Sequence, residues 1–204
     1  ITLRRHQLMP ADMYRGEIHG KDQFRDSHIS KLFQSASVWD KVAINNHYPA
    51  NSKKPLAYLL QLIQDQDTPD AQAELSRILD LSAWARFSVF ESLTQTQHYD
   101  YLHNWRLYYD PWRQKFLPAV WDPVGWATSW LPKQGANLEI NITRLHNALF
   151  KNGDFLRLRQ QVQRDFFSSG KADEFLELVS KTQHDMNHEV LSDPVLQPPV
   201  PARV

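Results

Sequence analysis

Apolar residues recur at helical spacing along three consecutive stretches of the chain, residues 54–65, 68–80 and 81–93. The first stretch has Pro55 near its start, a residue suited to the first turn of a helix. Thr68 and Asp80 stand where the N-caps of the second and third helices belong. In the third stretch the apolar residues, Trp84 and Phe87 among them, are spread almost all round the helix. This pattern predicts a helical body whose third helix is largely buried.

Shorter stretches have the composition of β-strands. Residues 104–110 and 115–122 are rich in aromatic and β-branched side chains, and a turn containing Pro111 separates them. They predict a β-hairpin inserted after the third helix. Near the N-terminus, residues 13–20 and 37–45 are expected to form two short strands with turn residues between them.

The last third of the chain returns to helical periodicity. Helices are expected at residues 141–152, 154–167 and 171–191, with Asp154 as the cap of the second, and a proline-rich extended tail follows at 193–204. The predicted fold class is therefore α+β: a mainly helical body with an inserted β-hairpin and a short strand-containing N-terminal edge. Because the chain begins at Ile1 without a methionine, it is expected to be a fragment of a longer protein.

The composition excludes several classes of protein. The 204 residues include 42% hydrophobic and 23% charged residues, enough apolar material for a packed core. The 23 basic residues balance 23 acidic ones, so nothing favours a nucleic-acid groove or an anionic membrane surface. No apolar run approaches the roughly 20 residues of a membrane span. The absence of cysteine excludes disulfides and thiolate metal sites, and it fits both the cytosol and an exported protein.

Two acids, Asp100 and Asp122, mark the ends of the predicted hairpin. His98, Asp100 and Asn104 follow a shortened form of the kinase catalytic-loop pattern H-R-D-x-x-x-x-N, with three residues in place of four between Asp and Asn. Asp122 precedes Gly125 closely, as the metal-binding acid of a kinase D-F-G motif precedes its glycine. In phosphoryl transfer one acid orients the attacking hydroxyl, while the Asn and the second acid hold Mg²⁺. The spacing alone equally allows an ordinary hairpin with a turn residue at Asp100 and a strand end at Asp122.

The segment DYLHNWRLYYDPWRQKFLPAVWDPVG, residues 100–125, resembles the CotH family of bacterial spore-coat atypical protein kinases. The likeness extends from about Tyr14 to about Leu191. It implies transfer of the ATP γ-phosphate to Ser or Thr hydroxyls of a protein, with Mg²⁺ or Mn²⁺. Asp100 would be the catalytic acid, and Asn104 and Asp122 the metal ligands. The family also suggests an extracytoplasmic or cell-surface location.

The resemblance also implies a division of the chain. Residues 1–50 would be a remnant of the small lobe and the lobe joint, 51–192 the kinase-like C-terminal lobe, and 193–204 a tail. The Gly-rich loop and the phosphate-binding lysine would belong to a part of the small lobe preceding residue 1, so the fragment alone is expected to be inactive. Glu17 would lie near the nucleotide base, or it is a solvated strand residue.

Two other functions stay open. CotH-like kinases often carry a second acid just after the one at Asp122, where this chain has Pro123 and Val124, which favours a non-catalytic structural scaffold of a coat or surface assembly. His184 and His188 are four residues apart, with Asp185 between them, as in zinc hydrolases, or they form a polar helix end. Other histidines, including His103 and His146, have no partner at ligand spacing and are expected at the surface or satisfied in the core.

Overall fold

The computed structural model describes residues 8–18, 31–43, 49, 52–124 and 138–192, with only the backbone of 188–191. The chain divides into two compact units, residues 1–162 and 163–204. In the described residues the fold is α+β, with six α-helices and a four-stranded antiparallel sheet. The expected tail at 193–204 and the glycine at position 125 lie outside the described residues.

The sheet belongs to the first unit and has the strand order β2-β1-β3-β4. Its strands are β1 (Asp12–Gly16), β2 (Trp39–Ala43), β3 (Trp105–Asp110) and β4 (Lys115–Pro118). β1 is therefore a central strand, paired antiparallel with both β2 and β3. The sequence predicted both N-terminal strands and the hairpin, but not that they join in one sheet.

The centre of the sheet depends on a glycine. Gly16, the last residue of β1, lies opposite Trp39 on one neighbouring strand and Trp105 on the other. A Cβ atom at this position would lie 2.7 Å from Cζ3 of Trp39, closer than real Cβ contacts come. Only glycine lets the Trp39 indole pack directly on the backbone of β1, so a larger residue here would displace the buried tryptophan.

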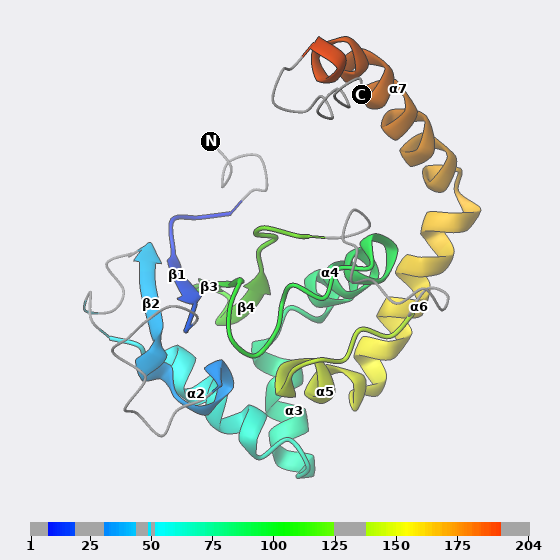
Figure 1. Cartoon of the computed structure of the whole chain (residues 1–204). Helices are drawn as coiled ribbons and strands as arrows, with labels where there is room; N and C mark the ends of the chain where they lie inside the picture. The colour runs from blue at the N-terminus through cyan, green and yellow to red at the C-terminus, as the bar shows by residue number, and fades with distance from the viewer. Residues whose placement is uncertain (1–7, 19–30, 44–48, 50–51, 125–137, 193–204) are drawn as a thin grey trace, which may run out of the picture. The chain divides into compact units, whose positions relative to one another are not determined.

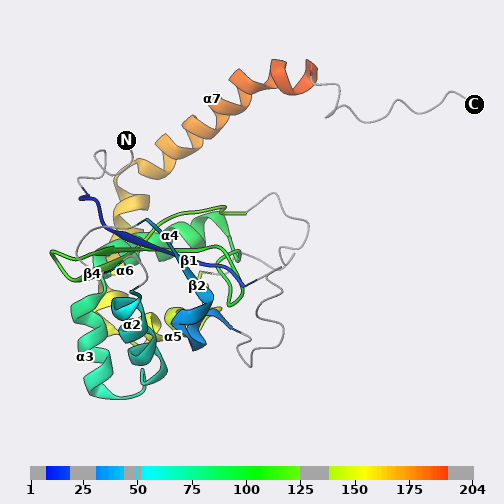
Figure 2. The ribbon, with the colours of Figure 1, turned by 90° about the vertical axis from the view of Figure 1, so that its left-hand side faces the viewer.

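The helices follow the predicted pattern closely. α2 (Lys54–Gln64), α3 (Pro69–Ile78) and α4 (Leu81–Thr94) match the first three predicted helices, and α5 (Arg144–Phe150), α6 (Gly153–Ser168) and α7 (Lys171–Ser192) match the last three. The Thr68 side chain accepts from the Ala71 N–H and Asp80 accepts from the Ala83 N–H, which confirms both predicted caps. α2, α3 and α5 lie together on one side of the sheet (Figures 1 and 2).

The predicted cap of α6 was wrong. The side-chain oxygen of Asn152 accepts from the N–H groups of Asp154 and Phe155, each at 3.0 Å, so Asn152 is the N-cap. Asp154 lies inside the first turn and pairs with Arg157. The Asn152-Gly153 pair resembles a helix end followed by a turn, but here Asn152 starts the helix.

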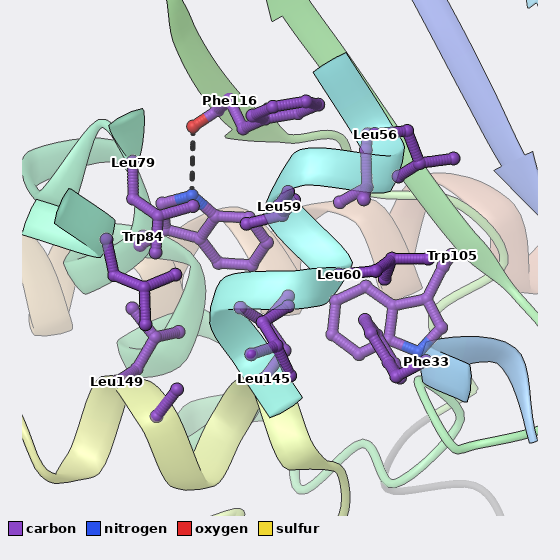
Figure 3. Packing of buried hydrophobic residues seen from close by; sticks show 14 of the residues in the cluster. Phe33, Leu56, Leu59, Leu60, Leu79, Trp84, Trp105, Phe116, Leu145 and Leu149 are labelled. Atoms are coloured by element: carbon purple, nitrogen blue, oxygen red, sulfur yellow. Dashed lines mark hydrogen bonds between the residues drawn. The ribbon is translucent and has the colours of Figure 1, made fainter. Parts of the chain in front are cut away.

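The core forms between the sheet, α2, α4 and α5. Trp84 is fully buried on α4 and its Nε1 donates to the Phe116 carbonyl oxygen at 3.0 Å. It points toward α2 and lies beside Leu59 (Figure 3). Phe87 is buried as well, which confirms that α4 is a largely buried helix. The indole nitrogen of Trp84 thus has a partner, as a buried polar group requires.

Polar contacts fix the hairpin turn to the start of α4. The guanidinium of Arg113 donates to Asp110 at 2.7 Å and to Asp80 at 3.1 Å. The Asp80 N–H also donates to the Phe116 carbonyl oxygen at 3.0 Å. The turn end of the hairpin is therefore anchored, which leaves the opposite end of the sheet for the acids at positions 100 and 122.

The second unit is described through the end of α6 and most of α7. Phe166 contacts both Phe167 and Phe175, with ring centroids 5.2 and 6.4 Å apart. Several large apolar side chains of this unit are exposed: Phe167, Leu176, Leu178 and Met186. In the part of the chain that the structure describes, no helix combines the length and apolar character needed to cross a membrane.

Candidate functional site

Three segments meet at one end of the sheet. β1 ends at Gly16 opposite Trp105, the first residue of β3. Two residues further on, the Ile18 N–H donates to the Leu102 carbonyl oxygen at 2.7 Å. Glu17, which lies between these two contacts, therefore borders the loop that carries Asp100 and Asn104.

The chain after β4 returns to the same end. The Ala119 N–H donates to the Arg106 carbonyl oxygen at 2.9 Å, which continues the pairing with β3. The Trp121 N–H then donates to the Tyr99 hydroxyl at 3.2 Å. Asp122 is thereby held beside the loop that begins at His98. The structure brings all four residues singled out in the sequence to this end of the sheet.

Asp100 has one carboxylate oxygen fixed and the other open. Its Oδ1 accepts from the N–H groups of Leu102 at 2.7 Å and His103 at 2.9 Å, and it lies 3.1 Å from the His103 Nδ1. Its Oδ2 accepts no hydrogen bond from any residue in the described ranges, and 25% of the side chain is exposed. The turn thus holds the carboxylate in place while one oxygen stays available to a ligand.

Asp122 is exposed and contacts His98. Its backbone has φ +46°, and its side chain is 57% exposed. The Nδ1 of His98 lies 2.8 Å from the Asp122 carbonyl oxygen and 3.6 Å from its carboxylate. Because a carbonyl oxygen can only accept, His98 carries a proton on Nδ1 and donates it to Asp122.

The two acids are connected through two stacked histidines. The rings of His98 and His103 meet edge to face with centroids 4.9 Å apart. His103 contacts Asp100 and His98 contacts Asp122. Residue spacing does not signal this arrangement, because it depends on how the loop around Asp100 turns.

Asn104 is buried between these groups. Its Nδ2 donates to the His98 carbonyl oxygen at 3.2 Å and lies 3.3 Å from the His103 Nδ1, while no residue of the described ranges donates to its Oδ1. Its φ of +68° is left-handed, like that of Asp122. Asn and Asp tolerate this region better than other residues with a side chain, and such backbone is common at ligand sites.

Glu17 interacts electrostatically with Arg106. It is half-buried just after β1. Burial lowers the pKa of Arg106, and the charge of Arg15 lowers it further, while the charges of Glu17 and Asp40 partly oppose that fall. The Arg106 guanidinium lies over the Trp121 ring, 4.6 Å from the centroid. Arg106 therefore interacts with Glu17 and also contacts the segment that carries Asp122.

Few described protein groups at this end of the sheet could take part in holding a metal. Across the described residues, no group of three or more His, Asp or Glu side chains could bind a metal ion by itself. Asn104 and Asp122 supply two hard oxygen donors, the amide oxygen without a partner and an exposed carboxylate. Mg²⁺ commonly takes one or two protein oxygens and completes its shell with water and phosphate, so these residues fit that ion.

The residues that resemble a zinc-hydrolase motif, His184, Asp185 and His188, lie on α7. The carboxylate of Asp185 accepts from the Lys181 ammonium at 2.5 Å, and both side chains are exposed. The side chain of His188 lies outside the described residues. An ion pair on an open helix face is the ordinary role of such an acid, and it does not prepare Asp185 to activate a water.

Behind the loop lies a buried polar pair that the sequence did not signal. Glu91 of α4 and His146 of α5 are almost fully buried, with Glu91 Oε1 3.1 Å from the His146 Nε2. The His146 ring lies 5.3 Å from that of Trp105, at the start of β3. His146 is thus a satisfied core histidine, one of the two outcomes expected for it, but its partner lies 55 residues away in sequence.

A comparison with models of known protein families finds no match for this chain. A comparison with curated proteins finds no match either. The likeness to CotH kinases therefore rests on the residues quoted above alone.

Proposed function

We propose that this chain carries the transfer site of a CotH-like protein kinase, which moves the ATP γ-phosphate to a Ser or Thr hydroxyl of a protein with Mg²⁺ or Mn²⁺. The observation that supports it is the meeting of Asp100 and Asp122 at one end of the sheet, connected through His103 and His98. An ordinary hairpin has no need of two acids bridged by two histidines.

Asp100 would orient the acceptor. Its Oδ1 is occupied by backbone N–H groups, so the carboxylate cannot rotate freely, and its Oδ2 is open. A Ser or Thr hydroxyl donating to Oδ2 would be aligned for attack, and the same oxygen could take the hydroxyl proton. This role depends on position more than on basicity, because phosphoryl transfer depends chiefly on alignment.

Asp122 and Asn104 would hold the metal side. When bound, Mg²⁺ or Mn²⁺ would neutralise the charge of the ATP phosphates. The chain's own contribution is to present the exposed Asp122 carboxylate and the buried Asn104 amide oxygen, to which no described residue donates. His98 acts as a positioning residue, because it donates to Asp122 while its own carbonyl oxygen accepts from Asn104. Glu17 and Arg106 would border the nucleotide. A lysine-bearing small lobe of the same protein would complete the phosphate site.

The test compares isosteric variants of the complete protein. Asp122→Asn is expected to abolish metal-dependent ATP binding, measured by calorimetry. Asp100→Asn keeps an oxygen for the Leu102 and His103 N–H groups, so it is expected to fold and to bind nucleotide. Its transfer of radiolabelled phosphate to protein should fall by roughly 10²-fold or more. Asp67→Asn, which alters an exposed acid between α2 and α3, is the matched control and should change neither measurement.

The competing function is a kinase-like structural scaffold. It is favoured by Pro123 and Val124, which occupy positions where CotH-like kinases often place a second acid. If the complete wild-type protein binds no nucleotide with either Mg²⁺ or Mn²⁺, the kinase proposal fails and the scaffold is preferred. Equal ATP binding by wild type and Asp122→Asn would likewise remove Asp122 from the metal site.

A further inference from the structure

A pocket adjoins the loop of Asp100. Its volume is about 470 Å³, and it is lined by Lys31 and Phe33 near η2 (Leu32–Gln34), by Tyr101, and by Ile142 and Arg144 at the start of α5, among others. Tyr101 directly follows Asp100, and its carbonyl oxygen accepts from the Leu32 N–H at 2.8 Å. The turn that fixes the Asp100 carboxylate therefore also forms one wall of this pocket.

The charge of the pocket is positive and unbalanced. Among the described residues that line it, Lys31 and Arg144 are the charged ones, and none is an acid. Neither forms an ion pair with a described acid, whereas Lys41, Arg77 and Arg113 each do. The Lys31 ammonium lies over the Tyr101 ring, 5.2 Å from its centroid. Two exposed cations that share one pocket favour an anionic occupant.

The lining also offers apolar contact. Phe33 is buried, Ile142 is half-buried, and 42% of Tyr101 is exposed. Aromatic and aliphatic walls next to cations suit the methylene groups and carboxylates of Asp or Glu side chains on an extended peptide. The metal-bound phosphates of ATP fit less well, because none of the described lining residues is an acid that could hold the accompanying metal.

We infer that this pocket binds acidic side chains of the protein segment that carries the acceptor Ser or Thr. The inference rests on the proposed kinase function and assigns it a substrate class: hydroxyls flanked by Asp or Glu. Lys31 and Arg144 would set this preference without touching the reacting atoms, and Tyr101 would connect it to the loop that orients the hydroxyl.

The test uses the complete protein and two fluorescein-labelled serine peptides of equal length, one flanked by Asp and Glu and the other by Lys and Arg. Fluorescence anisotropy is expected to show tighter binding of the acidic peptide, weakened by added salt. The double variant Lys31→Ala/Arg144→Ala should raise its Kd by roughly tenfold, as expected for two exposed ion pairs. Lys54→Ala/Arg86→Ala removes the same charge from α2 and α4 and is the control.

Phosphotransfer provides the second measurement. In the double variant we expect KM for the acidic peptide to rise while kcat stays unchanged. For a peptide flanked by neutral residues, KM and kcat of the double variant should equal those of the wild type. Charge reversal, Lys31→Glu/Arg144→Glu, should turn the preference toward the basic peptide. A partly unfolded variant would lose activity toward all peptides, so inversion of the preference cannot come from misfolding.

The failures of the two proposals are distinguishable. If Asp122-dependent transfer occurs but acidic and basic peptides bind equally, the pocket inference is overturned and the kinase stands. If the acidic peptide binds through Lys31 and Arg144 but no nucleotide binds, the peptide site stands and the kinase fails. Displacement of the acidic peptide by metal-free ATP would assign the cations to nucleotide phosphates, which also overturns the inference.

Discussion

At the scale of single residues, Glu91 is a buried acid in the core of the first unit, and only one of its two carboxylate oxygens has a partner among the described residues. Its Oε1 lies 3.1 Å from the His146 Nε2, but its Oε2 is buried without a hydrogen-bond partner. The Thr143 N–H donates to the His146 Nδ1, so the ring proton is on Nε2 and is donated to Glu91. Burial raises the pKa of Glu91, while His146 and Arg159 partly oppose that rise.

The raised pKa predicts a pH dependence of stability. The folded state binds a proton at Glu91 more readily than the unfolded state does, so its contribution is fully present below the ordinary pKa of 4.5 and is lost as pH rises through the raised value. Glu91→Gln should remove this loss. The free energy of unfolding of the variant, relative to wild type, is expected to increase between about pH 5 and about pH 8 in urea denaturation.

Glu74 provides the matched control with the opposite sign. Hydrogen bonds from Arg77 and Tyr58 lower its pKa to about 2, so its contribution is lost only as pH falls from about 4.5 toward 2. Between about pH 5 and about pH 8 the difference between Glu74→Gln and wild type should stay constant. A similarly constant difference for Glu91→Gln would show that Glu91 is charged in the folded protein.

At the scale of elements, α6 shows how one side chain fixes the start of a helix. Asn152 uses its Oδ1 to cap the first turn, and its Nδ2 donates to the Ser76 Oγ of α3 at 2.6 Å. The cap is thus also a tertiary contact between α3 and α6. The acid within that first turn, Asp154, forms an exposed pair with Arg157.

Replacement of the cap is expected to cost more stability than replacement of the exposed acid. Asn152→Ala should lower the free energy of unfolding by about 0.5–2 kcal/mol because two N–H groups lose their acceptor. Asp154→Ala should change it by less than about 1 kcal/mol. Asn152→Asp keeps the acceptor but loses the donor to Ser76, so it separates the two roles. Equal losses for Asn152→Ala and Asp154→Ala in urea denaturation would contradict the assignment.

At the scale of the whole molecule, the two units differ in how their backbone is protected. β1 and β3 are central strands, and α2 and α4 carry the fully buried side chains that pack against the sheet. By contrast, none of the described side chains of α7 is buried. Helices with little burial open locally at low free energy, whereas central strands open only near global unfolding.

Hydrogen exchange followed by mass spectrometry should show this difference. Peptides from α7 are expected to exchange on the order of seconds to minutes, and those from β1, β3 and α2 to stay protected for about hours. The edge strand β2 should lie between these limits. Strong protection of α7 in the isolated chain would mean that another surface covers the helix, and dilution of the protein would then show whether that surface is a second copy.

The sequence by itself determined the parts of the fold that arise from short-range interactions. Helical periodicity, the caps at Thr68 and Asp80, and the burial of α4 around Trp84 are set within a few residues of each position. The hairpin is equally local, since its strands pair across a short turn. Asp100 and Asp122 could therefore be placed at the same end of the hairpin before the structure was known, although their chemical roles remain predictions.

Only the tertiary structure decided what surrounds those acids. The insertion of β1 between β2 and β3, the contact of Glu91 with His146 and the pocket at Lys31 and Arg144 all join distant parts of the chain. Even the His98–His103 contact depends on how the loop turns around Asp100. Such pairs leave no periodic signal, because packing brings them together and sequence spacing does not.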